Sequence, residues 1–313
     1  METIKLGLFG AGGISSRVVK GIVQSENCEL VQICSRDINK AKKLAEQFDV
    51  TNYSDDYNDL FSDFIDGIYI VTINKLHYKH IKLCLENKKH VICEKPMLFN
   101  EKEIDELYDL ADKNNVLLLE AMKCRYSPTI NKIKQLLKDY PYPCNVTATF
   151  CRDEPFSKDY NHNYYDSEYG GAMKTIGCYV YSWIFELFPE RIIEANLQLN
   201  MHNGVENEAW LYLKNDKEMF MQLGCSVNYN TDNQAVISGD NYQIKIRDFW
   251  KDFDIELWQK DKIVSSFKED IGSEFSYQVD FFGKTIKKAD WLKVNQLERE
   301  FLKKVVGYYP TSR

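Results

Sequence analysis

The sequence predicts an α/β protein with a doubly wound parallel sheet at its N-terminus, followed by an α+β domain with a large open, mostly antiparallel sheet. From residue 3 to about 120, short apolar runs alternate with segments of helical period, as in successive strand and helix units. After about residue 190, strand-like runs follow one another through turns that contain Asn, Asp and Gly. Because 313 residues exceed what a single core usually holds, we expect two domains, residues 1-122 and 123-313.

The elements of the first domain follow from this alternation. Strands are expected at residues 3–9, 29–34, 67–73, 90–93 and 116–120, and helices at 14–23, 37–48, 76–88 and 100–115. Strands separated by helices pair in parallel, and the helices cover both faces of the sheet.

The second domain has a different pattern. A helix is expected at 131–140, a strand at 145–151, a polar and aromatic loop at 152–168 and a long apolar helix at 171–188. Strands follow at 191–199, 208–215, 218–227, 234–239, 242–250, 253–259 and 262–267. The open sheet that they predict is also a candidate surface for a homo-oligomer, a dimer or a tetramer.

Composition excludes several classes of partner. The net charge of -7 disfavours nucleic acid, which needs a clustered basic surface. No apolar stretch approaches the length of a membrane span, and the N-terminus lacks a signal-peptide pattern, so we expect a cytoplasmic protein that binds no membrane. The nine cysteines are scattered without a CxxC motif and read as reduced core thiols.

A glycine-rich turn follows the first strand. In GLFGAGGISS, Gly10, Gly12 and Ser15 stand in a GxGxxS pattern between a predicted strand and a predicted helix. Glycine allows the tight turn and lets the backbone approach a pyrophosphate, which then lies at the helix N-terminus. In this context the motif predicts dinucleotide binding, and a structural turn without a ligand is the alternative.

The end of the second strand predicts which dinucleotide is used. An acid at this position accepts the ribose hydroxyls of NAD, whereas the sequence has Ser35 followed by Arg36, which suits a 2'-phosphate. We therefore expect NADP to be favoured over NAD. Asp37 is the competing candidate for the ribose acid, or only the N-cap of the next helix.

Four segments resemble the family of glucose-fructose oxidoreductase and inositol dehydrogenase (Gfo/Idh/MocA). They are GLFGAGGIS, VTINKLHYKHIKLCLENKKHVICEKP, LLLEAMKCRYSP and YGGAMKTIGCYVYSW, within residues 3 to 190. The resemblance implies a Rossmann domain that binds NADP or NAD, a second domain that holds substrate, and oxidation or reduction at a hydroxyl-bearing carbon of a sugar, polyol or related molecule. The cofactor contacts that we expect are Gly10, Gly12, Gly13, Ile14, Ser35, Arg36, Thr72, Asn74, His77, Glu94 and Lys95.

The resemblance also implies the catalytic residues. The lysine of the EKP motif matches Lys95, which also explains why an apolar strand ends in charges, because the carboxyl ends of parallel strands face the ligand crevice. On the apolar helix, many members have an Asp and then a His or Tyr four residues later, and this chain has Thr175 and Tyr179. We expect Tyr179 to transfer the proton with help from the Lys95 ammonium. The alternative is that Tyr179 only packs among the aromatic residues of this helix.

The remaining candidates are less specific. Arg125, Tyr126 and Thr175, together with His162 and Tyr164 of the polar loop, are candidate substrate contacts. His77 and His80 lack a third ligand, so no metal is expected. Loss of the Asp at position 175 leaves open a second function, a dinucleotide-binding regulator that has lost the chemistry.

Overall fold

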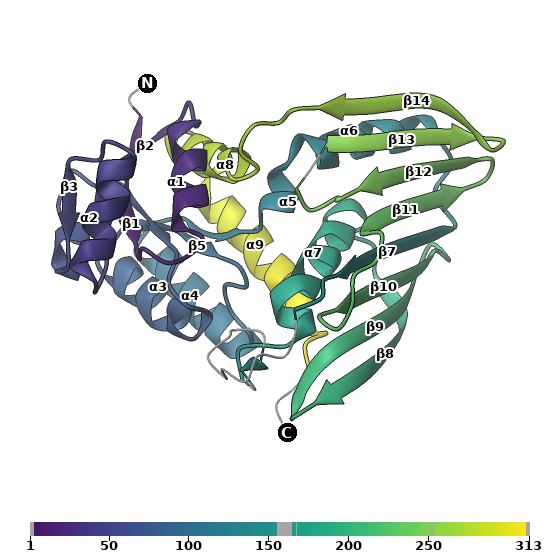
Figure 1. The fold of residues 1–313 in the computed structure, drawn as a ribbon, viewed down its shortest axis with the longest axis horizontal. Helices are drawn as coiled ribbons and strands as arrows, with labels where there is room; N and C mark the ends of the chain where they lie inside the picture. Colours follow the sequence, from purple (N-terminus) through teal and green to yellow (C-terminus); the bar gives the residue numbers. More distant parts are fainter. Residues whose placement is uncertain (1–2, 155–164, 167, 252, 311–313) are drawn as a thin grey trace. The chain divides into compact units, whose positions relative to one another are not determined.

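The computed structural model describes residues 3–154, 165–166, 168–251 and 253–310 (Figure 1). By internal contacts the chain divides into two compact units, Met1–Met122 with Gly272–Gly307, and Lys123–Ile271 with Tyr308–Arg313. The expected boundary after residue 122 coincides with a change of unit. Residues 272–307, which we assigned to the second domain, instead pack with the first unit.

The first unit contains a six-stranded sheet in which all neighbouring strands are parallel. The strand order is β3-β2-β1-β4-β5-β6. The strands are β1 (Ile4–Phe9), β2 (Cys28–Cys34), β3 (Asn52–Ser54), β4 (Gly67–Ile70), β5 (His90–Glu94) and β6 (Leu118–Ala121). The order reverses between β1 and β4, and ligands of such sheets bind where the carboxyl ends of the strands meet this reversal.

The helices of the first unit pack against this sheet and against one another. They are α1 (Ser15–Val23), α2 (Ile38–Gln47), α3 (His77–Glu86), α4 (Glu101–Lys113), α8 (Ser276–Lys287) and α9 (Trp291–Val306), with 3-10 turns η1 (Tyr57–Phe61) and η2 (Asn74–Leu76). α8 packs beside α1, and α9 packs beside α4 and β6. Val279 and Phe282 of α8 are fully buried, and Asn295 of α9 accepts a hydrogen bond from the Leu118 N–H (2.9 Å). These contacts explain why α8 and α9, for which the sequence analysis made no assignment, belong to the first unit.

The second unit contains an eight-stranded sheet in the order β14-β13-β12-β11-β7-β10-β9-β8. Its strands are β7 (Asn145–Cys151), β8 (Ile192–His202), β9 (Val205–Asn215), β10 (Phe220–Ser226), β11 (Gln234–Gly239), β12 (Tyr242–Arg247), β13 (Phe253–Gln259) and β14 (Lys262–Glu269). β7 and β10 pair in parallel, and the other neighbours are antiparallel. The prediction of a mostly antiparallel sheet is confirmed.

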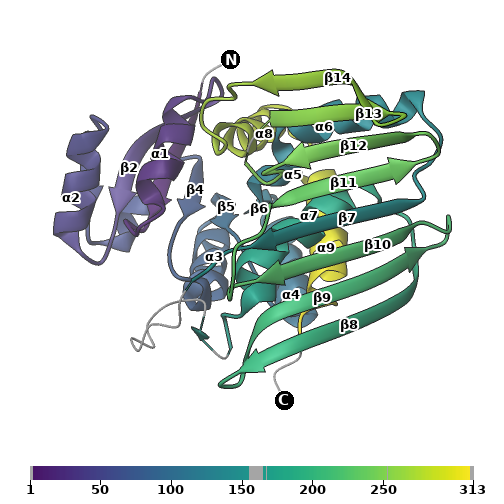
Figure 2. The ribbon, with the colours of Figure 1, turned by 45° about the vertical axis from the view of Figure 1, so that its right-hand side comes forward.

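One face of this sheet is covered by helices. They are α5 (Lys123–Tyr126), α6 (Pro128–Leu136), η3 (Leu137–Asp139), the π-helical turn η5 (Met173–Gly177) and α7 (Cys178–Leu187). α7 contacts β7 and β10, and α6 contacts β13. In Figure 2 the strands lie in front of α6 and α7 and present their other face to the viewer.

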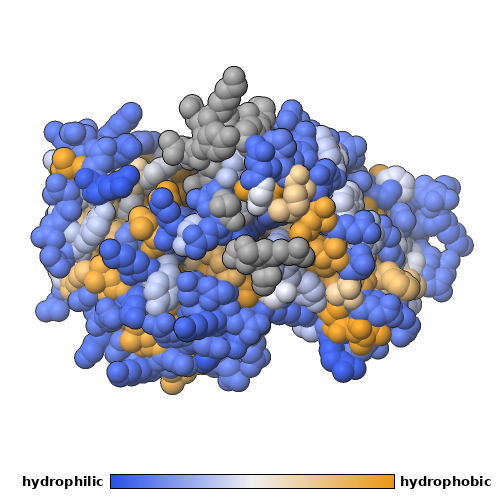
Figure 3. Space-filling model, turned by 90° about the horizontal axis from the view of Figure 1, so that it is seen from below, coloured by the Kyte–Doolittle hydropathy of each residue, from blue (hydrophilic) through white to orange (hydrophobic). Residues whose placement is uncertain are grey.

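The open face of this sheet carries exposed aromatic and apolar side chains. Tyr212 of β9 and Phe220 of β10 are 39% and 54% exposed. Figure 3 shows apolar patches between polar ones on the side of the molecule where β8 and β9 lie. Among the described helices, none combines the length and the apolar character that a membrane crossing requires.

Candidate functional site

The turn after β1 favours glycine at one position, Gly10. Gly10 has a φ of +117°, and a Cβ added there would lie 3.1 Å from Thr72 Cγ2. Its N–H donates to the Cys34 carbonyl (2.7 Å), and a Cβ at Gly12 would touch the Val71 carbonyl at 3.7 Å. A Cβ at Gly13 would meet nothing within 4 Å, so protein packing does not demand glycine at that position.

Helix α1 begins directly after this turn. Its N-cap, Ile14, makes no side-chain cap, and the first turn contains no acidic residue. The first N–H groups of α1 therefore meet no cap or acid from their own helix, which suits an anion such as a pyrophosphate. Ser15 is 1% exposed, and its hydroxyl has no hydrogen-bond partner in the described part of the chain.

The segment after β2 contains the residues that were predicted to select the cofactor. Ser35 is buried, and its hydroxyl accepts the Asp37 N–H (3.3 Å). Asp37 is the N-cap of α2, and its carboxylate accepts the N–H groups of Asn39 and Lys40 (3.1 and 3.3 Å). Arg36 is exposed and forms no ion pair or hydrogen bond with another described residue. The Arg36 guanidinium thus has no hydrogen-bond or ion-pair partner among the described residues. The Asp37 carboxylate, by contrast, already accepts two backbone hydrogen bonds.

The EKP segment at the end of β5 explains how the two charges are accommodated. Glu94 is 7% exposed, and its Oε1 accepts a hydrogen bond from the Tyr69 hydroxyl (2.8 Å). That hydroxyl in turn accepts from Gln278 Nε2 of α8 (2.6 Å). Lys95 is half-buried at the carboxyl edge of the sheet. Glu94 is therefore satisfied inside the first unit, and Lys95 is the charge that this strand end presents.

Sequence reasoning missed Glu120, which occupies the corresponding end of β6. It is 3% exposed, and its Oε1 accepts the N–H of Met97, two residues after Lys95 (2.9 Å). The available signal was its position, because Glu120 also closes a strand at the ligand edge of a parallel sheet. Burial, with Glu94 and Glu120 nearby, raises the pKa of the Cys93 thiol well above its usual value. A protonated thiol is a poor nucleophile, so Cys93 is a core residue.

The loop after β4 places Thr72, Asn74 and His77 in the same region. Thr72 and Asn74 are half-buried, and His77 is 1% exposed. Both ring nitrogens of His77 lie 3.0 Å from backbone carbonyl oxygens, those of Thr72 and Pro96. His80 is also engaged by the protein, with Nδ1 3.0 Å from Thr72 Oγ1. Among the described residues no group of His, Cys, Asp and Glu side chains is arranged to hold a metal.

In the second unit, Tyr179 differs from the other aromatic residues of its helix. Between Gly171 and Phe188, only Tyr179 and Glu186 are not buried. Tyr181, by contrast, is fully buried, and its hydroxyl lies 3.6 Å from Cys225 Sγ. A tyrosine that is only partly buried on an otherwise buried helix is available to a ligand in a way that Tyr181 is not.

Lys123 lies beside Tyr179, and the sequence analysis did not single it out. Its Nζ lies 5.6 Å from the centroid of the Tyr179 ring, and the residue is 4% exposed. The Phe150 ring contacts the same tyrosine at a centroid distance of 5.9 Å. The Tyr179 ring therefore has a cation and an aromatic neighbour within its own unit.

Thr175 occupies the position where the family pattern has an Asp. It lies in the π-helical turn η5, a type of turn that is frequent at functional sites. Its hydroxyl donates to the Gly171 carbonyl (2.6 Å), and the residue is 7% exposed. An ionised Asp accepts hydrogen bonds only and would not satisfy this carbonyl, so Thr175 makes a local contact that the acid does not.

Two buried residues of opposite charge, Lys174 of this turn and Glu206 of β9, influence each other electrostatically. Burial raises the pKa of Glu206, and burial lowers the pKa of Lys174, while each charge offsets part of that effect on the other. Lys174 Nζ also donates to the Glu168 carbonyl (2.6 Å). Glu206 fills the space against Gly171, where an added Cβ would lie 1.9 Å from Oε1.

Of the candidate substrate contacts, Arg125 is held by a carboxylate. Its Nε donates to Glu186 Oε2 (3.1 Å), and Lys134 Nζ donates to Glu186 Oε1 (2.6 Å). The Arg125 guanidinium also lies over the Tyr126 ring at 5.5 Å. His162 and Tyr164 lie outside the described residues.

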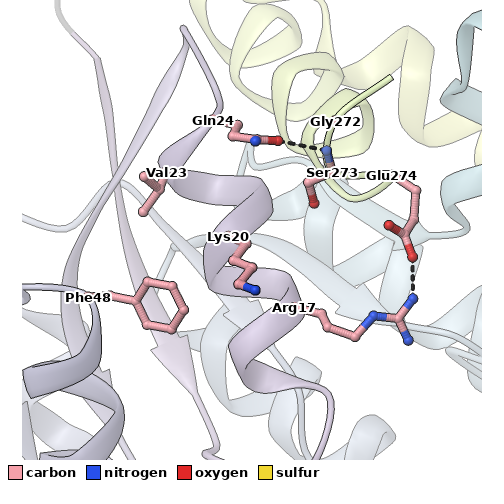
Figure 4. Close-up of a pocket in the computed structure, with 8 residues that line it drawn as sticks. All are labelled: Arg17, Lys20, Val23, Gln24, Phe48, Gly272, Ser273 and Glu274. Carbon is pink, nitrogen blue, oxygen red and sulfur yellow. Dashed lines mark hydrogen bonds and ion pairs between the residues drawn. The ribbon is translucent and has the colours of Figure 1, made fainter. Parts of the chain in front are cut away.

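A surface groove in the first unit, of about 440 Å³, is separate from these residues (Figure 4). Across it, Arg17 pairs with Glu274, and Gln24 Oε1 accepts the Ser273 N–H (2.7 Å). None of the predicted site residues lines it. Its lining is Arg17, Lys20, Val23, Gln24, Phe48, Gly272, Ser273 and Glu274.

Comparison with known proteins gives consistent matches. The profile of GFO_IDH_MocA, described as "Oxidoreductase family, NAD-binding Rossmann fold", matches residues 4–122. The trans-1,2-dihydrobenzene-1,2-diol dehydrogenase of Xenopus tropicalis is 29% identical over 272 residues, which are 85% of this chain and 79% of that protein. The scyllo-inositol 2-dehydrogenase (NADP(+)) IolU of Bacillus subtilis is 27% identical over 267 residues, which are 82% of this chain and 80% of that protein.

Solved structures share the fold over nearly the whole chain. A variant of KijD10, a 3-ketoreductase from Actinomadura kijaniata in complex with TDP-benzene and NADP, matches with a TM-score of 0.86 at 18% identity, covering 98% of this chain and 96% of that one. Levoglucosan dehydrogenase in complex with NADH and levoglucosan matches with a TM-score of 0.81 at 16% identity, covering 98% of each chain. The predicted family resemblance and fold class are confirmed.

Proposed function

We infer from the profile match over residues 4–122 that the chain is a member of the Gfo/Idh/MocA family of oxidoreductases with an NAD-binding Rossmann fold, and on this premise we propose a reaction for it. The chain transfers a hydride between a nicotinamide dinucleotide and the hydroxyl or carbonyl carbon of a sugar, polyol or related small molecule. One observation carries this proposal. Lys95 and the glycine turn of Gly10 and Gly12 lie at the same carboxyl edge of one parallel sheet.

NADP is the cofactor that the first unit fits better. The exposed guanidinium of Arg36 has no partner in the described chain, and a 2'-phosphate would supply one. Asp37, the candidate ribose acid, already caps α2. The relatives carry both cofactor names, NADP for IolU and KijD10 and NADH for levoglucosan dehydrogenase. The remaining proposed contacts are Gly10, Gly12, Gly13, Ile14, Ser35, Thr72, Asn74, Glu94 and Lys95.

The proton is handled by Lys95 and Tyr179. The bound dinucleotide supplies the carbon that accepts or returns the hydride. In the oxidative direction the substrate loses the hydrogen on its carbinol carbon as hydride and its hydroxyl proton to the Tyr179 oxygen, while the Lys95 ammonium orients the substrate oxygen. Reduction reverses both transfers. Crystallised variants of KijD10 replace one lysine and one tyrosine, which have the same separation in their sequence as Lys95 and Tyr179 have here.

The second unit supplies the substrate contacts. Arg125, Tyr126 and Thr175 are the described candidates, and His162 and Tyr164 remain predictions from the sequence. The names of the relatives include a cyclic diol, an inositol and an anhydrosugar, which supports a ring-shaped polyhydroxy substrate. The relatives and neighbours described above have enzyme names, and no observation favours the non-catalytic regulator.

The chain forms a homo-oligomer through the open face of the eight-stranded sheet. Trp210, Tyr212, Phe220 and Trp258 alternate with buried residues along their strands and so face away from the helices. Lys214 and Lys245 lie over the Phe220 and Trp258 rings at 5.4 and 3.8 Å. Light scattering on a Phe220→Lys, Tyr212→Lys double variant tests this surface. We expect the double variant to dissociate to monomers.

Eight of the nine cysteines are buried free thiols. A reducing compartment, the cytoplasm, therefore suits the protein.

Binding and turnover test the proposed reaction separately. Fluorescence titration with NADPH and NADH measures cofactor affinity, and reduced-nicotinamide absorbance reports turnover on a panel of cyclic polyols, aldoses and ketoses. We expect tight NADPH binding and activity on at least one member of the panel. Tight binding without activity on any of them would favour the regulator.

A further inference from the structure

His77 connects two loops at the carboxyl edge of the parallel sheet. It is the first residue of α3, and its side chain is almost completely buried. Nε2 lies 3.0 Å from the carbonyl oxygen of Thr72, which follows β4, and Nδ1 lies 3.0 Å from that of Pro96, which follows β5. A single imidazole thus spans the ends of two adjacent strands.

The same turn of α3 also contacts the end of β1. The ring of His80 stacks on Phe9, with 4.2 Å between centroids and 21° between planes. Phe9 is the last residue of β1, and Gly10 begins the glycine turn. His80 Nδ1 lies 3.0 Å from Thr72 Oγ1, so both histidines converge on Thr72. The first turn of α3 therefore connects the glycine turn, the loop after β4 and the EKP segment.

The Pro96 contact is the one that bears on Lys95. Pro96 follows Lys95 directly, and the next N–H, that of Met97, donates to Glu120 Oε1 (2.9 Å). The segment is thus fixed from two sides, by His77 at the Pro96 carbonyl and by Glu120 at the Met97 amide. Pro96 and Met97 are buried, so a carbonyl that lost its donor there would have no water to replace it.

We propose that His77 is a positioning residue, which holds the Lys95 to Met97 segment against the loop after β4 so that the Lys95 ammonium keeps its place. This inference rests on the proposed function of Lys95. The sequence analysis grouped His77 with the cofactor contacts, but both of its polar atoms face protein carbonyls. Its bond to the Pro96 carbonyl is the one that the positioning role requires.

The two carbonyl contacts are chemically unequal. A neutral imidazole carries one N–H, and burial lowers the pKa of His77, which favours this neutral form. Only one of the two contacts is then a donated hydrogen bond. The positioning role assigns this bond to Nδ1 and the Pro96 carbonyl.

Amide substitutions separate the two contacts. Asparagine places its side-chain nitrogen near the position of Nδ1, whereas glutamine places it near the position of Nε2. His77→Leu removes both ring nitrogens and keeps an apolar side chain in the buried site. His90→Leu is the matched control, because His90 begins the same strand β5 at its opposite end and accepts the Leu117 N–H (2.9 Å).

Three measurements are made on each full-length variant. Hydrogen exchange of peptides covering residues 94–99 reports how firmly the EKP segment is held. NADPH fluorescence titration reports cofactor binding. Turnover on a substrate that the wild type accepts gives kcat and KM, which report whether Lys95 is correctly placed.

We expect His77→Leu to speed exchange in residues 94–99 by about tenfold or more, as local opening becomes easier. We also expect kcat to fall by about tenfold or more with little change in KM, because misplacing a reacting group mainly weakens the transition state. NADPH affinity should change by less than about threefold. His77→Asn should restore most of the protection from exchange and most of kcat, whereas His77→Gln should restore neither. His90→Leu should leave exchange in residues 94–99 and kcat unchanged.

Several results would overturn the inference. Wild-type exchange and kcat in His77→Leu would show that the ring positions nothing. Rescue by Gln and not by Asn would assign the bond to Thr72, and NADPH affinity lost in parallel with kcat would make His77 a cofactor contact. If His77→Leu does not fold, the Asn and Gln pair decides on the same criteria. If exchange responds as expected but the wild type turns over no substrate, the positioning of the segment stands and the proposed function fails.

Discussion

The ammonium of Lys123 lies over the aromatic ring of Tyr179, 5.6 Å from its centroid, and both residues belong to the second unit. The cation is almost completely buried, and in such settings a cation–π contact is stronger than at an exposed site. Lys123 therefore helps to fix the orientation of the ring whose hydroxyl we propose to carry the proton.

Replacement of Lys123 by Met tests this relationship. Met keeps much of the aliphatic stem and removes the charge, so we expect the fold to survive and kcat to fall by about tenfold, as a contact worth up to about 2 kcal/mol is lost. Steady-state kinetics and circular dichroism are the measurements. Lys123→Arg keeps a cation and should retain most of the activity, and equal losses in Arg and Met variants would contradict a role for the charge.

Lys95→Met and Tyr179→Phe each remove one member of the proposed proton-handling pair. Either change should lower turnover by about 10²- to 10⁴-fold, the range for losing an acid or base group, with NADPH binding retained. Because the two residues act as a unit, the double variant should cost little more than the worse single one. Tyr181→Phe is the matched control, since Tyr181 is fully buried two residues away. Normal turnover in Tyr179→Phe would place the proton donor elsewhere.

Arg36→Ala should weaken NADPH binding by about tenfold or more and leave NADH binding nearly unchanged. The expected difference reflects one charge-assisted contact to the 2'-phosphate, which NADH lacks. Fluorescence titration of both cofactors measures it. Lys42→Ala, on the same segment with only an exposed pair to Glu46, controls for a general loss of positive charge. Equal weakening of both cofactors would remove Arg36 from the selection of the phosphate.

Much of this organisation could be predicted from the sequence, because the signals are local. The strand before Gly10, the glycine spacing and the charges after the β5 strand all occur within short segments, and each is placed as expected. Asp37 was left open between two roles, and its hydrogen bonds to α2 now show the N-cap. The cofactor and catalytic roles of these residues stay predictions.

The missed features depend on contacts between distant parts of the chain. α8 and α9 join the first unit because Asn295 and the apolar side chains of these helices fit surfaces formed more than 170 residues earlier. The position of Lys123 beside Tyr179 depends on the packing of α5 against α7, and the position of Glu120 beside the EKP segment depends on the pairing of β6 with β5. The packing of α5 against α7 is not encoded by spacing along the sequence, whereas the pairing of β6 with β5 follows from the expected parallel sheet.

Because His90 is held in its neutral form in the folded chain, we expect the free energy of unfolding to fall in mild acid. Burial lowers its pKa to about 4, and its Nδ1 accepts the Leu117 N–H, a bond that protonation would break. Between about pH 4 and 6.5 the unfolded chain binds a proton that the folded chain does not, so stability falls as pH decreases through this range. His90→Asn should flatten this dependence in urea unfolding curves. An unchanged slope would show that other groups carry the effect.

Gly171 and Gly204 give a matched test of the packing beside η5. Both have positive φ, +92° and +81°, so alanine strains the backbone at either position. A Cβ at Gly204 would meet nothing within 4 Å, whereas a Cβ at Gly171 would overlap the buried carboxylate of Glu206. We expect Gly204→Ala to lower the free energy of unfolding by about 1 kcal/mol, and Gly171→Ala to lower it by about 2 kcal/mol more, because overpacking adds to the strain. Urea unfolding measures both. Equal losses would mean that Glu206 moves aside at no cost, and the tight packing beneath the turn that carries Thr175 would then have no energetic role.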